Sequence, residues 1–254
     1  METATLAFVF VFGTIIGSFL NVCIARLPDG RSIVRPPSHC PQCQSFIAWY
    51  DNVPILSYLV LAGRCRSCRT RISPLYPAVE VLTGALAVAL FLRLGPSLAF
   101  AGYFAFAAAL VTITFIDLDH QIIPDVISLP GIAVGLAFSL VSPLVTPMDA
   151  LLGALLGGGI LLSVAWLYKT LRGQDGMGGG DVKLLAMIGA FLGWRSIFVT
   201  LFVGSVIGSV IGVVLMLYQR ADSKLAIPFG PFLACGALVY LFFGDRIVAF
   251  YFGG

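Results

Sequence analysis

Residues 97–117 read SLAFAGYFAFAAALVTITFID, a run with no charged side chain until Asp117 at its end. A helix needs about 20 mostly apolar residues to cross the roughly 30 Å hydrocarbon core of a bilayer. Lipid offers backbone groups no hydrogen-bond partner, so a spanning segment of this kind must be helical. The stretch therefore predicts a membrane-spanning helix that ends in a carboxylate.

The rest of the chain shares this apolar character. Of its 254 residues, 59% are hydrophobic and 11% are charged, whereas about a quarter of the residues of a soluble domain are charged. Mean hydropathy is +1.01. We therefore predict an all-α polytopic membrane protein embedded in a lipid bilayer. The eight expected transmembrane helices, of which the sixth is short, are residues 4–24, 78–94, 97–117, 127–145, 149–170, 183–194, 197–218 and 228–250.

Basic residues indicate which side of the membrane each connection faces, because cytoplasmic loops are enriched in Lys and Arg. With eight spans, twelve of the 15 Lys and Arg residues fall on one side: Arg26, Arg31, Arg35, Arg64, Arg66, Arg69, Arg71, Lys169, Arg172, Lys183, Arg220 and Lys224. We therefore expect both termini on the outer side. The predicted domains are a first transmembrane helix (1–24), a small cytoplasmic domain (25–77) and a transmembrane core of about seven helices (78–254). The net charge of +3 is too small to favour a nucleic-acid partner, and the sequence gives no oligomeric state.

Four of the six cysteines form two Cys-x-x-Cys pairs in the cytoplasmic domain, Cys40 with Cys43 and Cys65 with Cys68. Two such pairs, here separated by 21 residues, are typical of a four-thiolate structural zinc site. A loop of about 50 residues buries little core, so the metal would supply much of its folding energy. Two disulfides are the alternative, but they need an oxidising compartment.

Two aspartates stand out among the twelve acidic residues. Asp117 ends the run quoted above, and Asp119 would point about 200° away from it on a helix. Asp181 follows the segment GMGGG (176–180), which has so few side chains that another chain could approach its backbone closely. By the topology above, Asp117 and Asp181 both lie at the cytoplasmic end of a helix. Asp125 is placed to cap the next helix.

Each aspartate alone has an ordinary interpretation, interfacial for Asp117 and helix-capping for Asp181. Together, two carboxylates at one depth in a partly desolvated bundle would have pKa values pushed apart, so that one holds a proton while the other stays ionised. That state suits peptide hydrolysis by a general base and a general acid. Glu80 could orient a catalytic group, or it could be a simple cap or a partner for a nearby arginine. Lys183 could favour ionised Asp181 or merely mark the cytoplasmic side.

Six blocks of the sequence resemble the type IV prepilin peptidase family of Gly-x-Gly-Asp intramembrane aspartyl proteases. They occur in family order over essentially the whole chain. The blocks are GSFLNVCIARLP (17–28), the two cysteine pairs around WYDNVPILSYL (49–59), ISPLYPAVEVLTG (72–84), DLDHQIIPD (117–125), GMGGGDVKLLA (176–186) and IPFGPFLACGA (227–237).

The resemblance implies that Asp117 and Asp181 are the catalytic pair and that Gly178, Gly179 and Gly180 form the active-site loop. It implies an eight-helix fold in the bacterial inner membrane, with a cytoplasmic site that removes the basic leader from prepilins or pseudopilins. Many bacterial members also methylate the new amino terminus with S-adenosylmethionine, and the zinc-bearing members carry the same four cysteines. The resemblance gives no donor-binding residues.

Two other functions compete with this one on the sequence alone. An ion-coupled membrane carrier would use its carboxylates to relay protons, but it would place them near the midplane of the bilayer. A non-catalytic membrane adaptor would bind a partner through the zinc loop, which leaves the two aspartates unexplained. We therefore expect a peptidase.

Overall fold

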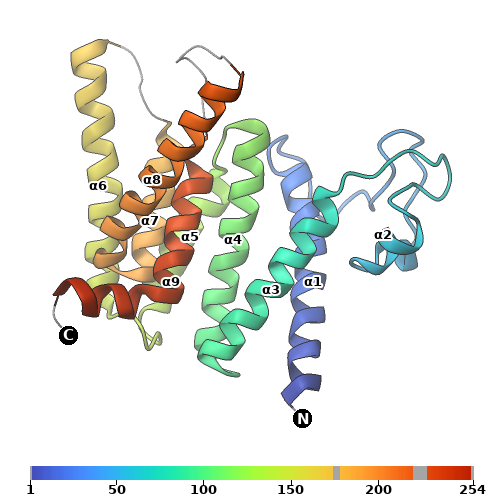
Figure 1. The fold of residues 1–254 in the computed structure, drawn as a ribbon, viewed down its shortest axis with the longest axis horizontal. Coiled ribbons are helices and arrows are strands. Elements are labelled where there is room, and N and C mark those ends of the chain that lie inside the picture. Colours follow the sequence, from blue (N-terminus) through green and yellow to red (C-terminus); the bar gives the residue numbers. More distant parts are fainter. Residues whose placement is uncertain (1, 174–177, 220–227, 253–254) are drawn as a thin grey trace. The chain divides into compact units, whose positions relative to one another are not determined.

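A computed structural model describes residues 2–173, 178–219 and 228–252, and these residues are mainly helical (Figure 1). Each of the eight predicted ranges overlaps one long helix, so the all-α prediction is confirmed for the described chain. The long helices are α1 (Glu2–Arg26), α3 (Leu75–Leu94), α4 (Leu98–His120), α5 (Asp125–Phe138), α6 (Pro147–Arg172), α7 (Gly179–Leu192), α8 (Trp194–Gln219) and α9 (Gly230–Phe252). Two short helices, η1 (Trp49–Asn52) and α2 (Leu56–Val60), lie between α1 and α3. Arg220 and Lys224, used above for orientation, lie outside the described residues.

Six of the described helices are long and apolar enough to cross a membrane, namely α1, α3, α4, α6, α8 and α9. The helices α5 and α7 have 14 residues each, which gives about 21 Å against roughly 30 Å of hydrocarbon. α7 is short because it lies between Gly178 and Gly193, and Gly193 has a φ of 80° that no helix accommodates. The described residues therefore form a multi-pass membrane protein, and crossing by α5 and α7 stays a prediction.

The chain divides into two compact units, residues 1–112 and 113–254. In the first unit, α1 packs along α3 through glycines. A Cβ atom on Gly13 would lie 2.7 Å from the Ala87 Cβ, and one on Gly17 would lie 2.7 Å from the Glu80 Cα. Small residues of this kind let membrane helices approach closely. The close approach brings the polar residues of α1 and α3 into contact.

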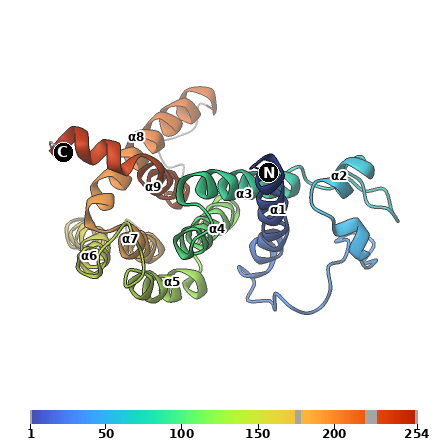
Figure 2. The same ribbon diagram turned by 90° about the horizontal axis from the view of Figure 1, so that it is seen from below.

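In the second unit, α7 is the central helix. It packs between α5 and α6, as the end-on view in Figure 2 shows, and it also contacts α8 and α9. Every residue from Leu184 to Leu192 is buried. The backbone of α6 meets that of α7 where Gly153 contacts Gly189, and a Cβ on Gly157 would lie 2.5 Å from the Leu185 carbonyl oxygen. The four-residue glycine spacing of α6 thus produces close helix packing.

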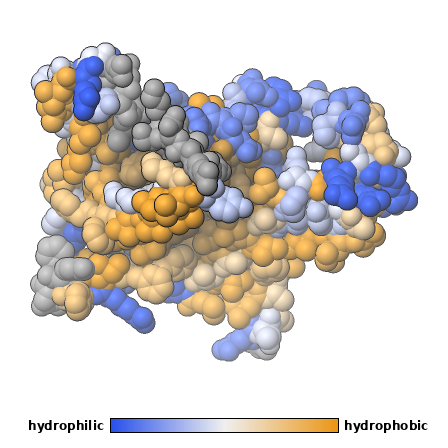
Figure 3. Space-filling view, turned by 45° about the horizontal axis from the view of Figure 1, so that its top comes forward, coloured by the Kyte–Doolittle hydropathy of each residue, from blue (hydrophilic) through white to orange (hydrophobic). Residues whose placement is uncertain are grey.

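The helices expose many large apolar side chains. Phe202 and Leu217 of α8 are 68% and 78% exposed, and Leu155 of α6 is 63% exposed. Figure 3 shows apolar side chains over much of the visible helical surface and a larger share of hydrophilic ones over residues 25–77, which we call the loop domain. Lipid tails are as apolar as these side chains, so the exposed surface is suited to contact with a bilayer.

Candidate active site and metal centre

Asp117 lies in the last turn of α4, and its side chain is only 4% exposed. Its carboxylate oxygen Oδ2 accepts a hydrogen bond from the backbone N–H of Gly230 at 2.9 Å. Gly230 is the first residue of α9 and is 113 positions away in the chain. The packing of the second unit therefore places a helix N-terminus against the carboxylate that ends α4.

Asp181 lies in the first turn of α7, half-buried, and is close enough to Asp117 for the two charges to interact. Ile123, in the segment between α4 and α5, joins the two positions. A Cβ atom on Gly180 would lie 2.8 Å from the Ile123 Cβ, and one on Gly230 would lie 3.3 Å from the Ile123 Cδ1. The structure thus brings the two predicted aspartates together around Ile123.

The three glycines before Asp181 differ in their surroundings. Gly178 is the extended N-cap residue of α7, and its carbonyl oxygen accepts the N–H of Asp181 at 3.3 Å. Gly179 is exposed, with open space where a side chain would be, whereas Gly180 faces Ile123. Gly176, the first glycine of the run, lies outside the described residues. The described glycines leave the approach to Asp181 free of side chains.

The remaining acids of this segment have other contacts. Asp119 is exposed, as its position two residues after Asp117 predicts. The N-cap of α5 is Pro124, so the expectation that Asp125 caps this helix is wrong. The Asp125 carboxylate instead accepts two bonds from the Lys183 ammonium, at 2.7 and 2.8 Å. Lys183 therefore joins α7 to α5.

Sequence reasoning missed two residues of this site. Gly230 is followed by Pro231, and a Gly-Pro step is a usual way to begin a helix. The sequence therefore indicated that the N–H at position 230 has no acceptor within its own helix. Nothing in the sequence distinguished Ile123 from other apolar residues between helices. Both act through contacts that only the tertiary fold creates.

The first unit contains a second buried carboxylate, that of Glu80 on α3, which is 8% exposed. Its Oε2 accepts the N–H of Ile55 at 2.8 Å, and it also bonds the Ser18 side chain of α1. Asn21 of α1 donates to the Tyr76 carbonyl oxygen at 3.0 Å. The polar residues of α1 therefore bond α3, as expected for polar groups between membrane helices. Glu80 bonds no arginine in any described contact.

The four cysteines of the loop domain converge. Their Sγ atoms all lie within 4.8 Å of one another, and those of Cys40 and Cys68 are 3.8 Å apart. Sulfurs at the Zn–S distance of about 2.3 Å in a tetrahedral site are also about 3.8 Å apart. All four cysteines are free of disulfides. The geometry and the all-sulfur donor set therefore fit a tetrahedral zinc ion, with no position left for a substrate.

The two cysteine pairs have the same local fold. The carbonyl oxygen of Cys40 accepts the N–H of Gln44 at 2.9 Å, and that of Cys65 accepts the N–H of Arg69 at 3.0 Å. Gln44 and Arg69 both have positive φ, at 57° and 59°. Each tight turn directs its two sulfurs to the same side, which is the arrangement that a shared metal ion requires.

The electrostatics of two of the cysteines favour the thiolate that zinc binds. The Ser45 hydroxyl, 2.9 Å from the Cys43 Sγ, is the main cause that lowers the pKa of this thiol to about 6. Backbone N–H groups, first that of Cys68, lower the pKa of the Cys65 thiol. Since the thiolate and not the thiol is the metal ligand, these two shifts suit a metal centre, whereas burial and the neighbouring cysteine side chains raise the pKa of the Cys68 thiol to about 11.

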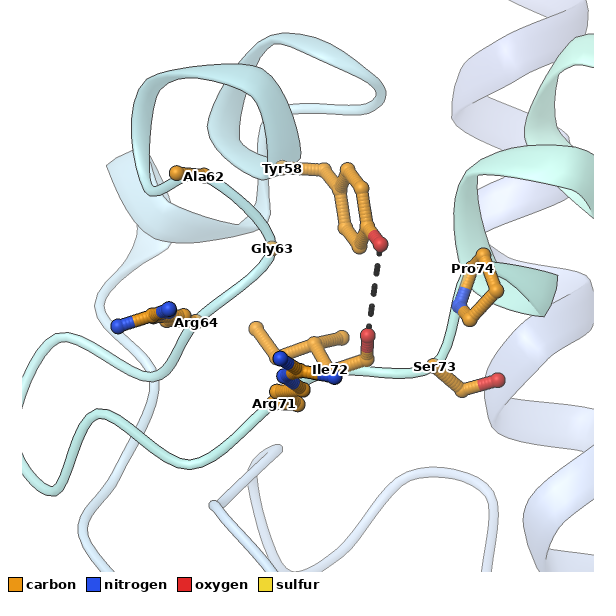
Figure 4. A pocket seen from close by; sticks show the side chains of 8 residues that line it. All are labelled: Tyr58, Ala62, Gly63, Arg64, Arg71, Ile72, Ser73 and Pro74. Carbon is orange, nitrogen blue, oxygen red and sulfur yellow. Dashed lines mark hydrogen bonds between the residues drawn. The ribbon is translucent and has the colours of Figure 1, made fainter.

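A cavity of about 600 Å³ lies in the loop domain (Figure 4). The Tyr58 side chain borders it, and its hydroxyl donates to the Ile72 carbonyl oxygen at 3.4 Å. Its other lining residues include Gly63, Arg71 and Pro74. Neither aspartate of the site in the second unit lines this cavity.

Comparison with known proteins gives consistent matches. Residues 11–94 match the bacterial peptidase A24 N-terminal domain, and residues 104–213 match the type IV leader peptidase family. No solved structure matches the chain significantly.

Three curated relatives are described as prepilin leader peptidase/N-methyltransferase. The Aeromonas hydrophila protein is 39% identical over 96% of this chain and 92% of its own length. The Stutzerimonas stutzeri protein is 39% identical, and the Pseudomonas aeruginosa protein 36%, each over 97% of this chain and 94% of its own length. With such similarity along nearly its full length, the chain belongs to the type IV leader peptidase family.

Proposed function

We propose that this protein removes the leader peptide from type IV prepilins or pseudopilins and then methylates the new amino terminus. The observation that carries the proposal is the meeting of Asp117 and Asp181, two carboxylates from different helices, around Ile123. The family and the names of the relatives support both activities. Asp117 and Asp181 are the proposed catalytic residues, and Gly178, Gly179 and Gly180 form the loop beside them.

Two adjacent carboxylates in a largely dehydrated site cannot both be ionised at low cost, so the pair holds one proton. The ionised carboxylate takes a proton from water while the water oxygen attacks the scissile carbonyl carbon. The protonated one polarises the carbonyl oxygen, and a proton then reaches the leaving amine. The open space at Gly179 leaves room for the extended peptide that such a reaction requires.

The proposed orientation places this site and the loop domain in the cytoplasm and both termini outside the bacterial inner membrane. It rests on the excess of Lys and Arg in alternate connections between eight crossings. A prepilin has a basic leader on the cytoplasmic side and a hydrophobic helix in the bilayer. Its scissile bond would then lie at the depth of the helix ends that carry Asp117 and Asp181.

The proposed role of the zinc ion is structural. Cys40, Cys43, Cys65 and Cys68 supply four ligands, and a catalytic zinc ion would keep one position open for water or substrate. The loop domain has few buried residues of its own, of which Cys40 is one. Zinc binding would therefore provide much of its folding free energy.

The proposed methyl donor is S-adenosylmethionine, which supplies an electrophilic methyl group. The cavity of the loop domain falls within the ~300–1,000 Å³ range of small-molecule sites. In this proposal Arg71 pairs with the donor carboxylate there, and Tyr58 packs against the adenine ring.

The test uses the detergent-purified protein and a prepilin substrate, with products identified by mass spectrometry. Asp117→Asn and Asp181→Asn should each strongly reduce cleavage, whereas Asp119→Asn, which replaces an exposed aspartate on the same helix as Asp117, should cleave normally. Mature pilin should gain one methyl group only when S-adenosylmethionine is added. A carrier or an adaptor would leave prepilin intact even with the unmutated protein, and that result would refute the proposal.

A further inference from the structure

The two aspartates of the site have different hydrogen-bond partners. Asp117 accepts the N–H of Gly230 at 2.9 Å in a buried position. The Asp181 carboxylate is influenced by burial and by the charge of Asp117, and no described residue donates a hydrogen bond to it. The pair is therefore asymmetric, and the asymmetry comes from a single backbone amide.

The sequence at the start of α9 leaves this amide available. An N-terminal amide of a helix has no acceptor within the helix. Pro231 has no N–H, and the N–H of Phe232 already donates to the Phe229 carbonyl oxygen at 3.1 Å. A Cβ atom on Gly230 would lie 2.6 Å from the Asp117 Oδ2. Only glycine permits this contact, because any side chain would displace the carboxylate.

We propose that Gly230 is a positioning residue that makes Asp117 the general base and leaves the shared proton on Asp181, the general acid. The inference rests on the proposed peptidase function. A backbone N–H satisfies an ionised carboxylate, and a donor of this kind to a charged acceptor is among the stronger hydrogen bonds. The carboxyl group without a donor is then the better place for the one proton.

The ends of the helices have smaller effects. Asp181 lies at the positive end of α7, which favours its ionised form. Asp117 lies at the negative end of α4 but also at the positive end of α9, so these two contributions oppose each other. A direct charge-assisted hydrogen bond exceeds a typical helix-end contribution by about twofold or more, so the amide of Gly230 decides the outcome.

The reaction balances with one water molecule. Asp117 takes a proton from the water, whose oxygen forms a bond to the scissile carbonyl carbon, while Asp181 gives its proton to the carbonyl oxygen. Asp117 then gives its proton to the amide nitrogen as the C–N bond breaks. Asp181 recovers a proton from the tetrahedral intermediate as the new carboxyl group forms, so both residues return to their initial states.

The first experiment compares Gly230→Ala with Gly159→Ala in prepilin cleavage. Gly159 is a matched helical glycine on α6 with open space around its Cβ position. Gly230→Ala should lower kcat by about 10²-fold with little change in KM, as expected when a catalytic base is misplaced. The acid limb of its kcat–pH profile should also lie at a higher pH than in the unmutated protein, because the ionised form of Asp117 loses its donor. Gly159→Ala should match the unmutated protein.

The acid limb of this profile can be assigned because, among the described residues, few charged groups face Asp117. Asp181 approaches it from α7, Lys183 is bonded to Asp125, and the first turn of α9 carries no acidic residue. A general packing defect would lower kcat without moving the limb. An unchanged acid limb in a folded Gly230→Ala protein would overturn the inference.

A second experiment needs no change at Gly230. Asn at position 181 can still donate a hydrogen bond to the scissile carbonyl, whereas Asn at position 117 cannot take a proton from water. Residual cleavage by Asp181→Asn should therefore exceed that of Asp117→Asn by about tenfold. The reverse order would refute the assignment of roles while leaving the peptidase function intact. If both variants cleaved normally, the proposed function itself would fail.

Discussion

Two buried carboxylates on membrane helices, Asp117 in the second unit and Glu80 in the first, make nearly the same contact. Each accepts a backbone N–H from a distant segment, at 2.9 Å from Gly230 and at 2.8 Å from Ile55. They differ in the neighbour that completes the site. Glu80 also bonds the Ser18 hydroxyl, a donor, whereas Asp117 lies within electrostatic range of Asp181, a second carboxylate.

This difference separates a structural acid from a catalytic one. A buried carboxylate surrounded by donors has its hydrogen bonds satisfied without taking up a proton. A buried carboxylate beside another carboxylate must share one proton with it, and a shared proton can be transferred. Burial alone therefore does not identify a catalytic acid in a membrane protein, and the chemistry of its neighbours does.

Removal of the metal should have the largest effect. This effect should be confined to the first unit, which contains Glu80 and the loop domain. A chelator should unfold the loop domain, because structural zinc sites of this type contribute about 10–16 kcal/mol of apparent free energy. Trypsin should then cut at the arginines between Arg64 and Arg71. Metal analysis should find one zinc ion per chain before treatment, and Cys43→Ser should reproduce the effect of the chelator.

The matched control for this prediction is Cys235→Ser, since Cys235 lies on α9 outside the cluster. It should keep both its zinc ion and its resistance to trypsin. If the loop domain resisted trypsin equally well without metal, its fold would not depend on zinc, and the proposed structural role of the metal would be refuted.

Neutral replacement of the two acids should have the next largest effect. Asp117→Asn should lower kcat/KM for prepilin by about 10³-fold or more, because the site loses its proton acceptor. Glu80→Gln should change it by less than about threefold, since the glutamine oxygen still accepts the N–H of Ile55. Parallel kinetic assays of the two variants measure the contrast. A loss of cleavage in Glu80→Gln as large as that in Asp117→Asn would remove the distinction between the two acids.

The sequence predicted most of the helices because a spanning segment must be both apolar and helical, and the ranges around Asp117 and before Asp181 follow directly. It also predicted the cluster of four cysteines, since Cys-x-x-Cys turns are local. It did not predict the bonds from Gly230 to Asp117 and from Lys183 to Asp125, which join residues 113 and 58 positions apart. Contacts of that kind depend on how helices pack, and hydropathy carries no such information.

Deletion of the contact at Glu80 should have a moderate effect on stability. Glu80→Ala would leave the N–H of Ile55 without its partner, and an unsatisfied buried group costs about 1–3 kcal/mol. Ile55 also has a φ of 62°, a strained conformation for a β-branched residue that needs support from its surroundings. Thermal unfolding in detergent should show the loss in Glu80→Ala and little loss in Glu80→Gln. Equal melting temperatures for the two variants would show that the hydrogen bond to Ile55 contributes nothing.

The smallest effect is expected at Asp125, an acid with an equally short bond but an exposed position. Its partner Lys183 lies 2.7 Å away, and the two side chains are 56% and 36% exposed. Exposed ion pairs contribute about 0.2–1 kcal/mol, so a double-mutant cycle of Asp125→Ala and Lys183→Ala should give a coupling free energy in that range. The coupling should shrink in high salt, because exposed charges are screened. A coupling well above this range that persists in salt would mean that Lys183 does more than join α7 to α5, and that its charge acts on the neighbouring Asp181.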